Sequence, residues 1–274
     1  GEKKMANGKY VSTLDVDAMS VPVLAATVFA AEESSLFLGG NLIPIVNAPS
    51  GLLQVPELAK VTAQTVSSEA ATGVDLDAQT ISDTKNNIVC ELIAARAVVR
   101  DLGNIDPNEI GRLLGRSVAT AFDKAVYAAL DTSVDSTTDC VPLSLDAIFD
   151  SVAQIRANGE NGQLYSVITP AQANTVVKSI GTAAYAGGDF QTEALRSGYI
   201  GNVAGVQMFV SSNITAANTS GYIFGQDALR IAMQKNVDIE IGRRTAAVGN
   251  DVVASLHAKP AMIDNSRAIR MINV

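Results

Sequence analysis

The only histidine of the chain, His257, is the residue that a nucleophile–histidine–acid site would have to use. It stands in residues 252–260, VVASLHAKP, where apolar and polar residues alternate as they do in a strand with one buried face. A half-exposed strand position therefore explains His257 better than a catalytic role does. The sequence also contains no GxSxG nucleophile motif.

Paired carboxylates are the next candidates for chemistry. Asp75 and Asp77, and likewise Asp238 and Glu240, are two residues apart, so each pair would share one face of a strand and could serve a metal ion or acid–base catalysis. No histidine, asparagine or further acid is placed to converge on either pair. Solvated strand faces are the simpler interpretation, and we expect no catalytic, metal or cofactor site and no enzyme activity.

The glycines do not form a phosphate-binding loop. Gly111 and Gly115 fall inside a helical pattern, where close packing of the helix explains them, and no G-x-x-x-x-G-K-[ST] motif is present. Gly201 and Gly205 do not complete a dinucleotide fingerprint, because the strand–loop–helix context is missing. Nucleotide binding is therefore not predicted.

The two cysteines, Cys90 and Cys140, are far apart and form neither a zinc motif nor a disulfide framework, so a reducing cytoplasm is expected.

The net charge of −8 argues against a surface built to bind nucleic acid. Residues 1–91 carry 5 basic and 11 acidic side chains, whereas residues 225–274 carry 7 basic and 5 acidic ones. This asymmetry favours contact between the front of one copy and the back of another, although solvated surface charge also explains it. The Arg243–Arg244 doublet would suit a carboxylate across such an interface.

The longest apolar run, residues 21–31, has 11 residues and includes Pro22, which is too short to cross a bilayer. We interpret it as an internal packing segment, and no membrane association is expected.

One long helix is predicted over residues 106–131, with Asp106 as its cap, Pro107 in its first turn and Glu109 reaching back toward the cap. Arg112, Arg116, Asp123 and Lys124 fall largely outside its apolar stripe. The members of that stripe recur at spacings of three and four: Ile110, Leu113, Leu114, Val118, Ala121, Phe122, Ala125, Val126 and Ala129.

The other segments divide by pattern. Residues 1–50 have no sustained period and suit an arm that lies on other surfaces, and residues 51–100 suit a long hairpin with little core of its own. Residues 132–139 are predicted to be a loop. A helix capped by Ser144 and ending near Asn158-Gly159, a strand over 164–168 and a second helix capped by Thr169 follow. Further strands are predicted over 201–210, 222–224, 228–233, 237–241, 251–258 and 268–272.

The order of these parts resembles the major capsid proteins of tailed bacteriophages, the Hong Kong 97-type α+β fold that encapsulin compartments share. GNVAGVQMFVSSNI at 201–214, FGQDALRIAMQKNVDIEIGRR at 224–244 and DVVASLHAKPAMID at 251–264 are similar to the late strands of that family. The resemblance implies five regions: an N-terminal arm (1–50), an extended hairpin loop (51–100), a spine helix region (101–139), an axial domain (140–225) and peripheral strands (226–274).

The resemblance also implies a function: self-assembly into pentamers and hexamers of an icosahedral shell that encloses double-stranded DNA without sequence-specific binding. It implies a virion location, assembly in the host cytoplasm, and separate scaffold, portal and decoration proteins as partners. The arm and hairpin would then bury their apolar area mainly on adjacent copies, and the stripe of the long helix would lie against the strands of 226–274. Candidate contacts between copies are Lys60, Glu69, Asp75, Asp77, Arg112, Arg116, Lys124, Arg243 and Arg244.

Three alternatives stay open. An encapsulin-like compartment has the same fold but encloses cargo enzymes. A phage tail or decoration protein is also structural and would form tubes or trimers. A soluble α/β enzyme is disfavoured by the lone histidine and the missing nucleotide loops.

Overall fold

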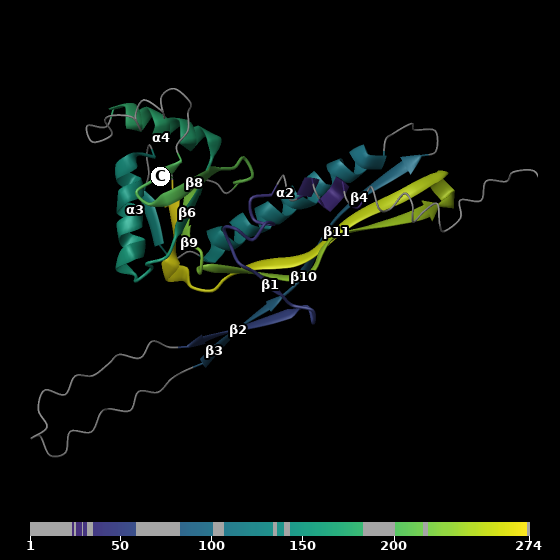
Figure 1. Cartoon of the computed structure of the whole chain (residues 1–274), viewed down its shortest axis with the longest axis horizontal. Helices are drawn as coiled ribbons and strands as arrows, with labels where there is room; N and C mark the ends of the chain where they lie inside the picture. The colour runs from purple at the N-terminus through teal and green to yellow at the C-terminus, as the bar shows by residue number, and fades with distance from the viewer. Residues whose placement is uncertain are drawn as a thin grey trace, which may run out of the picture.

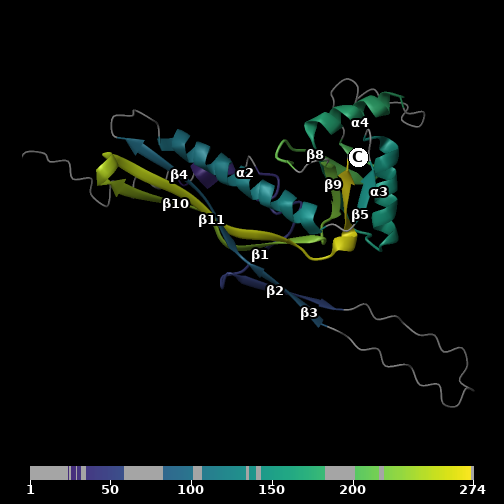
Figure 2. The ribbon, with the colours of Figure 1, turned by 180° about the vertical axis from the view of Figure 1, so that it is seen from behind.

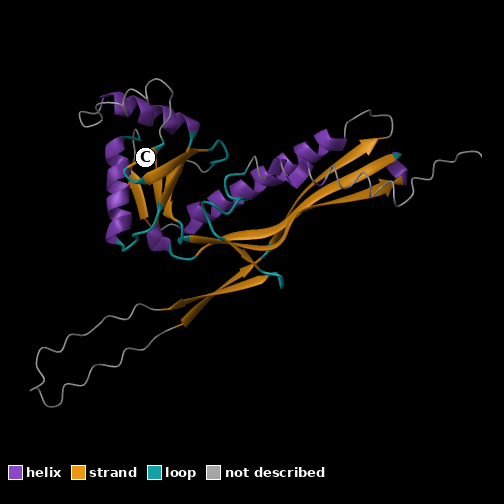
Figure 3. Cartoon of the chain, in the orientation of Figure 1, coloured by secondary structure: helices purple, strands orange, loops and turns teal. Residues whose placement is uncertain are grey.

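The computed structural model describes residues 24, 26–28, 30–31, 35–58, 83–100, 107–133, 136–139, 143–182, 201–215 and 219–272. Within these residues a four-stranded and a six-stranded sheet form two separate parts of the molecule, which we call the first and the second layer. The long helix α2 (Pro107–Ser133) runs along the first layer and ends at the second (Figure 1). A two-stranded hairpin projects from the first layer (Figure 3). The α+β class expected from the sequence is confirmed.

The four-stranded sheet has the order β1-β10-β11-β4. The short strand β1 (Ile45–Asn47) runs parallel to β10 (Leu229–Arg244), and β11 (Gly249–Met262) pairs antiparallel with both β10 and β4 (Glu91–Arg100). Alternation in β11 places Val252, Ala254, Leu256 and Ala258 on the face that packs against α2. The prediction that the helix lies against strands of 226–274 is therefore confirmed for β11, and α2 also covers β4.

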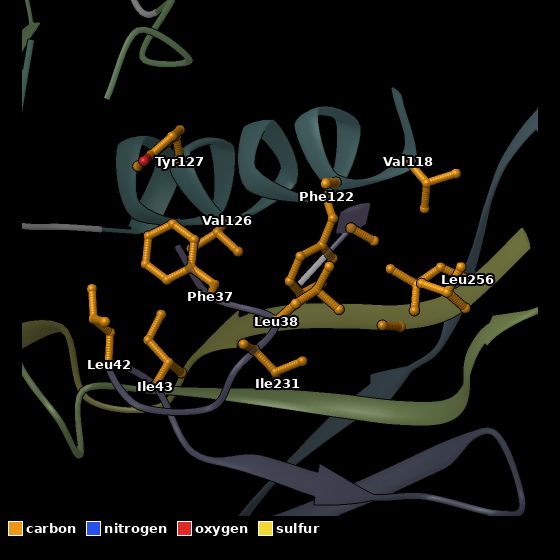
Figure 4. Close-up of a cluster of buried hydrophobic side chains, with 14 of the residues drawn as sticks. Phe37, Leu38, Leu42, Ile43, Val118, Phe122, Val126, Tyr127, Ile231 and Leu256 are labelled. Carbon is orange, nitrogen blue, oxygen red and sulfur yellow. The ribbon is translucent and has the colours of Figure 1, made fainter. Parts of the chain in front are cut away.

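A shared apolar core joins the helix to this sheet. Val118, Phe122 and Val126 of α2 are buried and pack with Ile231 of β10 and Leu256 of β11 (Figure 4). At roughly 25 cal/mol per Å² of buried apolar area, such side chains contribute about 1.5–3 kcal/mol each. Helical and strand periodicity thus converge on one interface because each element has one apolar face to cover.

The predicted helical stripe needs three corrections. Leu113 is 68% exposed and Ala121 is also exposed, although both were assigned to the stripe. Asp123, assigned to the polar face, is 1% exposed. The reason is that the described part of the arm covers a second flank of α2, which turns the buried arc away from Leu113 and toward Asp123 and Tyr127.

The described part of the arm packs on its own subunit. Phe37 and Ile43 are fully buried, and the Phe37 ring meets Tyr127 edge-on with centroids 5.5 Å apart. At Gly115 of α2, a Cβ atom would lie 2.3 Å from the Thr27 carbonyl oxygen, so the glycine permits the close helix packing expected from the sequence. The expectation that the arm gains most of its burial on adjacent copies is wrong for these residues.

The hairpin consists of β2 (Leu52–Leu58) and β3 (Asp83–Val89), which pair antiparallel with Leu52 opposite Val89 and Leu58 opposite Asp83. Residues 91–100, expected to continue the hairpin loop, instead form β4, which pairs with residues 249–258 of β11. The difference arises because Ile93, Ala95, Ala97 and Val99 supply an apolar face that packs against the core beside α2.

The six-stranded sheet has the order β5-β12-β9-β6-β8-β7. Helices α3 (Leu145–Ala157) and α4 (Pro170–Thr182) pack on one face through a core that includes Ile148, Ile155 and Val176, and Tyr165, Tyr222 and Phe224 on the other face join the core under α2. Figure 2 shows this layer from behind. The strands are β5 (Ser136–Asp139), β6 (Leu164–Ile168), β7 (Asn202–Val203), β8 (Val206–Val210), β9 (Thr219–Gly225) and β12 (Ala268–Ile272).

Local signals located α3, β6 and α4 correctly. The Ser144 hydroxyl accepts from the Ala147 amide at 3.3 Å, and Thr169 Oγ1 accepts from the Gln172 amide at 3.4 Å. Asn158 ends α3, and Gly159 follows with φ of 91°, a conformation that favours glycine. The start of α2 at Pro107 is also as predicted, whereas Asp106 lies outside the described residues.

Sheet membership differs from the prediction in three places. The break expected between the predicted strands 228–233 and 237–241 is an irregularity inside one long strand, β10. Residues 136–139, predicted as part of a loop, form β5. Strand β12, assigned to the peripheral strands, pairs with β9 and β5 in the six-stranded sheet, because its Ile269 and Met271 complete the core beneath α3.

Candidate subunit interface

The outward face of α2 carries an isolated group of positive charges. Arg112, Arg116 and Lys124 are exposed, and none of them forms a salt bridge with another residue of the described part of the chain. Arg112 and Arg116 are one helical turn apart, and Leu113, next to Arg112 in the chain, is 68% exposed beside them. A face that combines cations with an apolar side chain suits an acidic protein segment that also carries an apolar residue.

A second basic site lies at the turn between β10 and β11. Arg243 and Arg244 are exposed, and Arg243 Nη1 donates to Asn250 Oδ1 at 3.4 Å. The bidentate hydrogen bond from Arg96 holds the pKa of the Asp251 carboxyl below its ordinary value, and Arg244 adds to this effect. Figure 1 shows this turn and the start of α2 toward the same end of the molecule.

The base of the hairpin exposes large apolar side chains that the sequence did not single out. Leu52 is 40% exposed, Val89 58% and Leu92 63%. Leu52 and Val89 are opposite each other in the β2–β3 register, and Leu92 follows Val89 by three residues at the start of β4. Strand alternation was visible in the sequence, but the uncovered face of the hairpin is known only because Leu53, Val55 and Ile88, on its other face, pack with Ala232 and Ala261 of the four-stranded sheet.

The four remaining candidates, Lys60, Glu69, Asp75 and Asp77, lie outside the described residues. The five that are described occupy two places, the outward face of α2 and the β10–β11 turn. The five described candidates are therefore not gathered into one cluster within a single copy.

Of the groups singled out for chemistry, His257, Asp238 and Glu240 lie on the open face of the four-stranded sheet, and Asp75 and Asp77 lie outside the described residues. His257 is half-buried, as predicted, with Lys235 and Leu92 opposite it on the two neighbouring strands. Lys235 pairs with Asp238 and holds the pKa of that carboxyl below its ordinary value. Across the described residues, no group of three or more His, Cys, Asp or Glu side chains is arranged to hold a metal ion.

Two charge pairs join segments that are far apart in the chain, and no sequence pattern pointed to them. Glu160, with 6% of its side chain exposed, receives a hydrogen bond from Arg267 Nη1 at 3.1 Å. Asp131 near the end of α2 accepts from Arg270 Nη1 of β12 at 2.9 Å and from the Tyr222 hydroxyl at 3.3 Å. These contacts hold the helix and β12 together where the chain passes between the sheets.

None of the helices described here is long and apolar enough to span a membrane.

No family model matches the chain, and no curated protein matches its sequence. Solved structures, in contrast, match most of its length. The capsid of cyanophage P-SCSP1u is 15% identical with a TM-score of 0.68, covering 86% of this chain and 88% of that chain. The structure from Mycobacterium phage Che8 is 20% identical with a TM-score of 0.66, covering 81% and 84%. A virus-like particle from Pyrococcus furiosus is 10% identical with a TM-score of 0.64, covering 93% and 98%.

Each of these matches covers 81% or more of this chain rather than one common substructure. The resemblance inferred from the order of the elements is confirmed at the level of the fold. The chain has the Hong Kong 97-type fold of tailed-phage major capsid proteins.

Proposed function

We propose that this chain is a major capsid protein that self-assembles into an icosahedral head shell around double-stranded DNA. The observation that carries the proposal is a shell-type fold whose hairpin projects from the body and exposes Leu52, Val89 and Leu92 at its base. Burying such side chains against another copy releases their surface from water, so assembly would stabilise a conformation that one copy alone leaves incomplete.

The regions implied by the resemblance are part of this proposal, with revised limits. Residues 1–50 act as the arm and the β2–β3 hairpin as the extended loop. Helix α2 is the spine, and β4, β10 and β11 form the peripheral sheet beside it. Strands β5 and β12 belong with the axial layer, since they pair in the six-stranded sheet.

Contacts between copies would use charge complementarity. The acidic residues Glu69, Asp75 and Asp77 of one hairpin would meet Arg112, Arg116 and Lys124 on the α2 face of the next copy, or Arg243 and Arg244 at its β10–β11 turn. Lys60 would contact an acidic group of a neighbour. Because such pairs are exposed at the rim of an interface, they would set partner orientation and salt dependence more than affinity.

A charge exchange tests these contacts. Arg116→Glu should impair assembly, and adding Asp77→Arg in the same chain should restore it if the two residues meet across copies. Lys178→Glu on α4 makes the same charge change at an exposed helical position in the other layer and should assemble normally. Sedimentation of the three variants at low salt gives the readout. Equal assembly of Arg116→Glu and Lys178→Glu would contradict the proposed role of the α2 face.

The shell itself is tested by negative-stain imaging of the purified chain over a range of salt and protein concentrations. Closed particles about tens of nanometres wide are expected, because identical subunits with closed symmetry form finite assemblies. A chain that stays monomeric under every condition would refute the proposed function.

An encapsulin-like compartment is the second candidate, favoured by the match to the virus-like particle from Pyrococcus furiosus. The two kinds of shell differ in what they enclose. Nuclease-resistant DNA in particles isolated from the native source supports the capsid, whereas a co-purifying cargo enzyme and no DNA supports the compartment. The capsid proposal includes a virion location, assembly in the host cytoplasm, and scaffold, portal and decoration proteins as separate partners.

A further inference from the structure

A buried carboxyl group lies where three distant segments of the chain meet. Asp123, in the middle of α2, is 1% exposed. Ser35 Oγ of the arm donates to Asp123 Oδ1 at 2.6 Å, and the Leu36 amide of the arm also donates to this carboxyl. Asn213 Nδ2, from the loop after β8, lies 3.5 Å from Asp123 Oδ2. One side chain therefore connects the arm, the long helix and the six-stranded layer.

The contact also organises the arm. Ser35 Oγ, while donating to Asp123, accepts hydrogen bonds from the amides of Phe37 and Leu38, both at 3.2 Å. This turn directs the fully buried Phe37 ring toward Tyr127 of α2. Losing the Asp123 contact would therefore loosen more of the arm than the two residues that touch the carboxyl.

We propose that Asp123 is a proton-operated latch, which holds the arm residues 35–43 and the loop 211–215 against α2 more tightly when its carboxyl is protonated than when it is ionised. An ionised carboxylate in this position is desolvated and is stabilised by neutral donors only. No Lys or Arg of the described residues forms a salt bridge with it. A protonated carboxyl carries no charge to desolvate, its carbonyl oxygen still accepts hydrogen bonds, and its O–H can donate to the Asn213 side-chain oxygen if that amide turns over.

The direction of the effect follows from linkage. Burial raises the pKa of Asp123 from 3.8 to about 6, partly offset by the hydrogen bonds from Ser35, Leu36 and Asn213. When the arm leaves, the carboxyl meets water and its pKa returns toward the ordinary value. The docked state therefore gains stability as the pH falls through about 6 and loses it as the pH rises. Between pH 8 and pH 5 the docking equilibrium should change by about tenfold.

Other groups near Asp123 are few. Tyr127, one turn along α2, is titratable, and burial raises its pKa above the ordinary value, so it remains neutral in this range. Lys124 is adjacent but exposed. Glu32 and Glu33 precede Ser35 in the sequence and lie outside the described residues, so a Glu32→Gln, Glu33→Gln variant serves as the control for titration elsewhere in the arm.

Hydrogen–deuterium exchange on the full chain between pH 5 and pH 8 measures how tightly the arm and the loop are docked. The rates are corrected for the intrinsic pH dependence of amide exchange. Protection of peptides covering 35–43 and 211–215 should rise about tenfold from pH 8 to pH 5, while β2 peptides at 51–58 should show no such step. In Asp123→Asn the dependence should vanish with the arm protected throughout, because a neutral amide fills the same space and Asn213 can turn its own amide to match. The Glu32→Gln, Glu33→Gln variant should keep the step.

An unchanged step in Asp123→Asn would overturn the proposal, and so would a wild-type chain with no step in either segment. If Asp123→Asn does not fold, Ser35→Ala gives the answer. Loss of a donor to the carboxylate should lower protection most at pH 8 and enlarge the step, and a uniform loss of protection at every pH would refute the latch. The readout concerns one subunit, so it is independent of whether shells form.

Discussion

Replacing Gly115 with alanine sets two effects of opposite sign against each other on α2. Alanine in place of an interior helical glycine stabilises a helix by about 1 kcal/mol. The added Cβ, however, would lie 2.3 Å from the Thr27 carbonyl oxygen and 3.2 Å from its Cα. Ordinary carbon–oxygen contacts are about 3.3 Å or more, so the arm backbone must retreat by about 1 Å. Because the clash involves backbone rather than a flexible side chain, no rotamer change relieves it.

Overpacking of this kind costs about 1–3 kcal/mol. The net loss expected for Gly115→Ala is therefore about 0–2 kcal/mol, concentrated at the contact with the arm. Urea unfolding of the dissociated chain measures the total, and hydrogen exchange in peptides that contain Thr27 measures the local effect. Exchange near Thr27 should accelerate while exchange in β11 stays unchanged. Gly242→Ala is the control, since no heavy atom lies within 4 Å of its added Cβ. A Gly115→Ala chain about 1 kcal/mol more stable, with Thr27 still protected, would refute the close approach.

Two further predictions concern stability. Phe122→Ala, at a fully buried position, should cost about 3–5 kcal/mol in thermal or urea unfolding, whereas Leu113→Ala on the same helix, 68% exposed, should change it by no more than about 0.5 kcal/mol; a larger loss at Leu113 would contradict the orientation of α2. Arg267→Ala leaves the buried Glu160 carboxylate without its cation and should cost about 3 kcal/mol. Arg230→Ala removes an exposed pair with Asp227 and two hydrogen bonds to nearby backbone carbonyls, and should cost less than about 1 kcal/mol. Similar losses for the two arginines would mean that Glu160 is not held as described.

The elements that the sequence located correctly are those fixed by interactions between near neighbours. The caps at Ser144 and Thr169 act within three residues, and the glycine after α3 acts at a single backbone position. Helical and strand periodicity likewise reveal which residues of α2 and β11 share a face. These local signals also gave the order of helices and strands along the chain, and that order indicated the fold.

Which distant strands pair with one another was decided by packing in the cores and not by local signals. Strand β12 has the composition of any short apolar strand, and it joins β9 and β5 because the core under α3 needs Ile269 and Met271. Likewise, residues 228–233 and 237–241 read as two strands, and only continuous pairing with β11 makes them one. The exposure of the basic residues on α2 followed from helical phase, whereas the uncovered apolar base of the hairpin depended on which face of β2 and β3 packs with Ala232 and Ala261.

Asp123 shows the limit most clearly. Its sequence neighbours place it near the edge of an amphipathic helix, where a carboxylate is ordinarily solvated. It is buried because Ser35, 88 residues earlier, and Asn213, 90 residues later, cover it and supply its hydrogen bonds. Sequence alone determined that this stretch is a helix with one apolar face. Only the tertiary structure decided how wide the buried arc is, because a second flank is covered by segments that no local pattern connects to it.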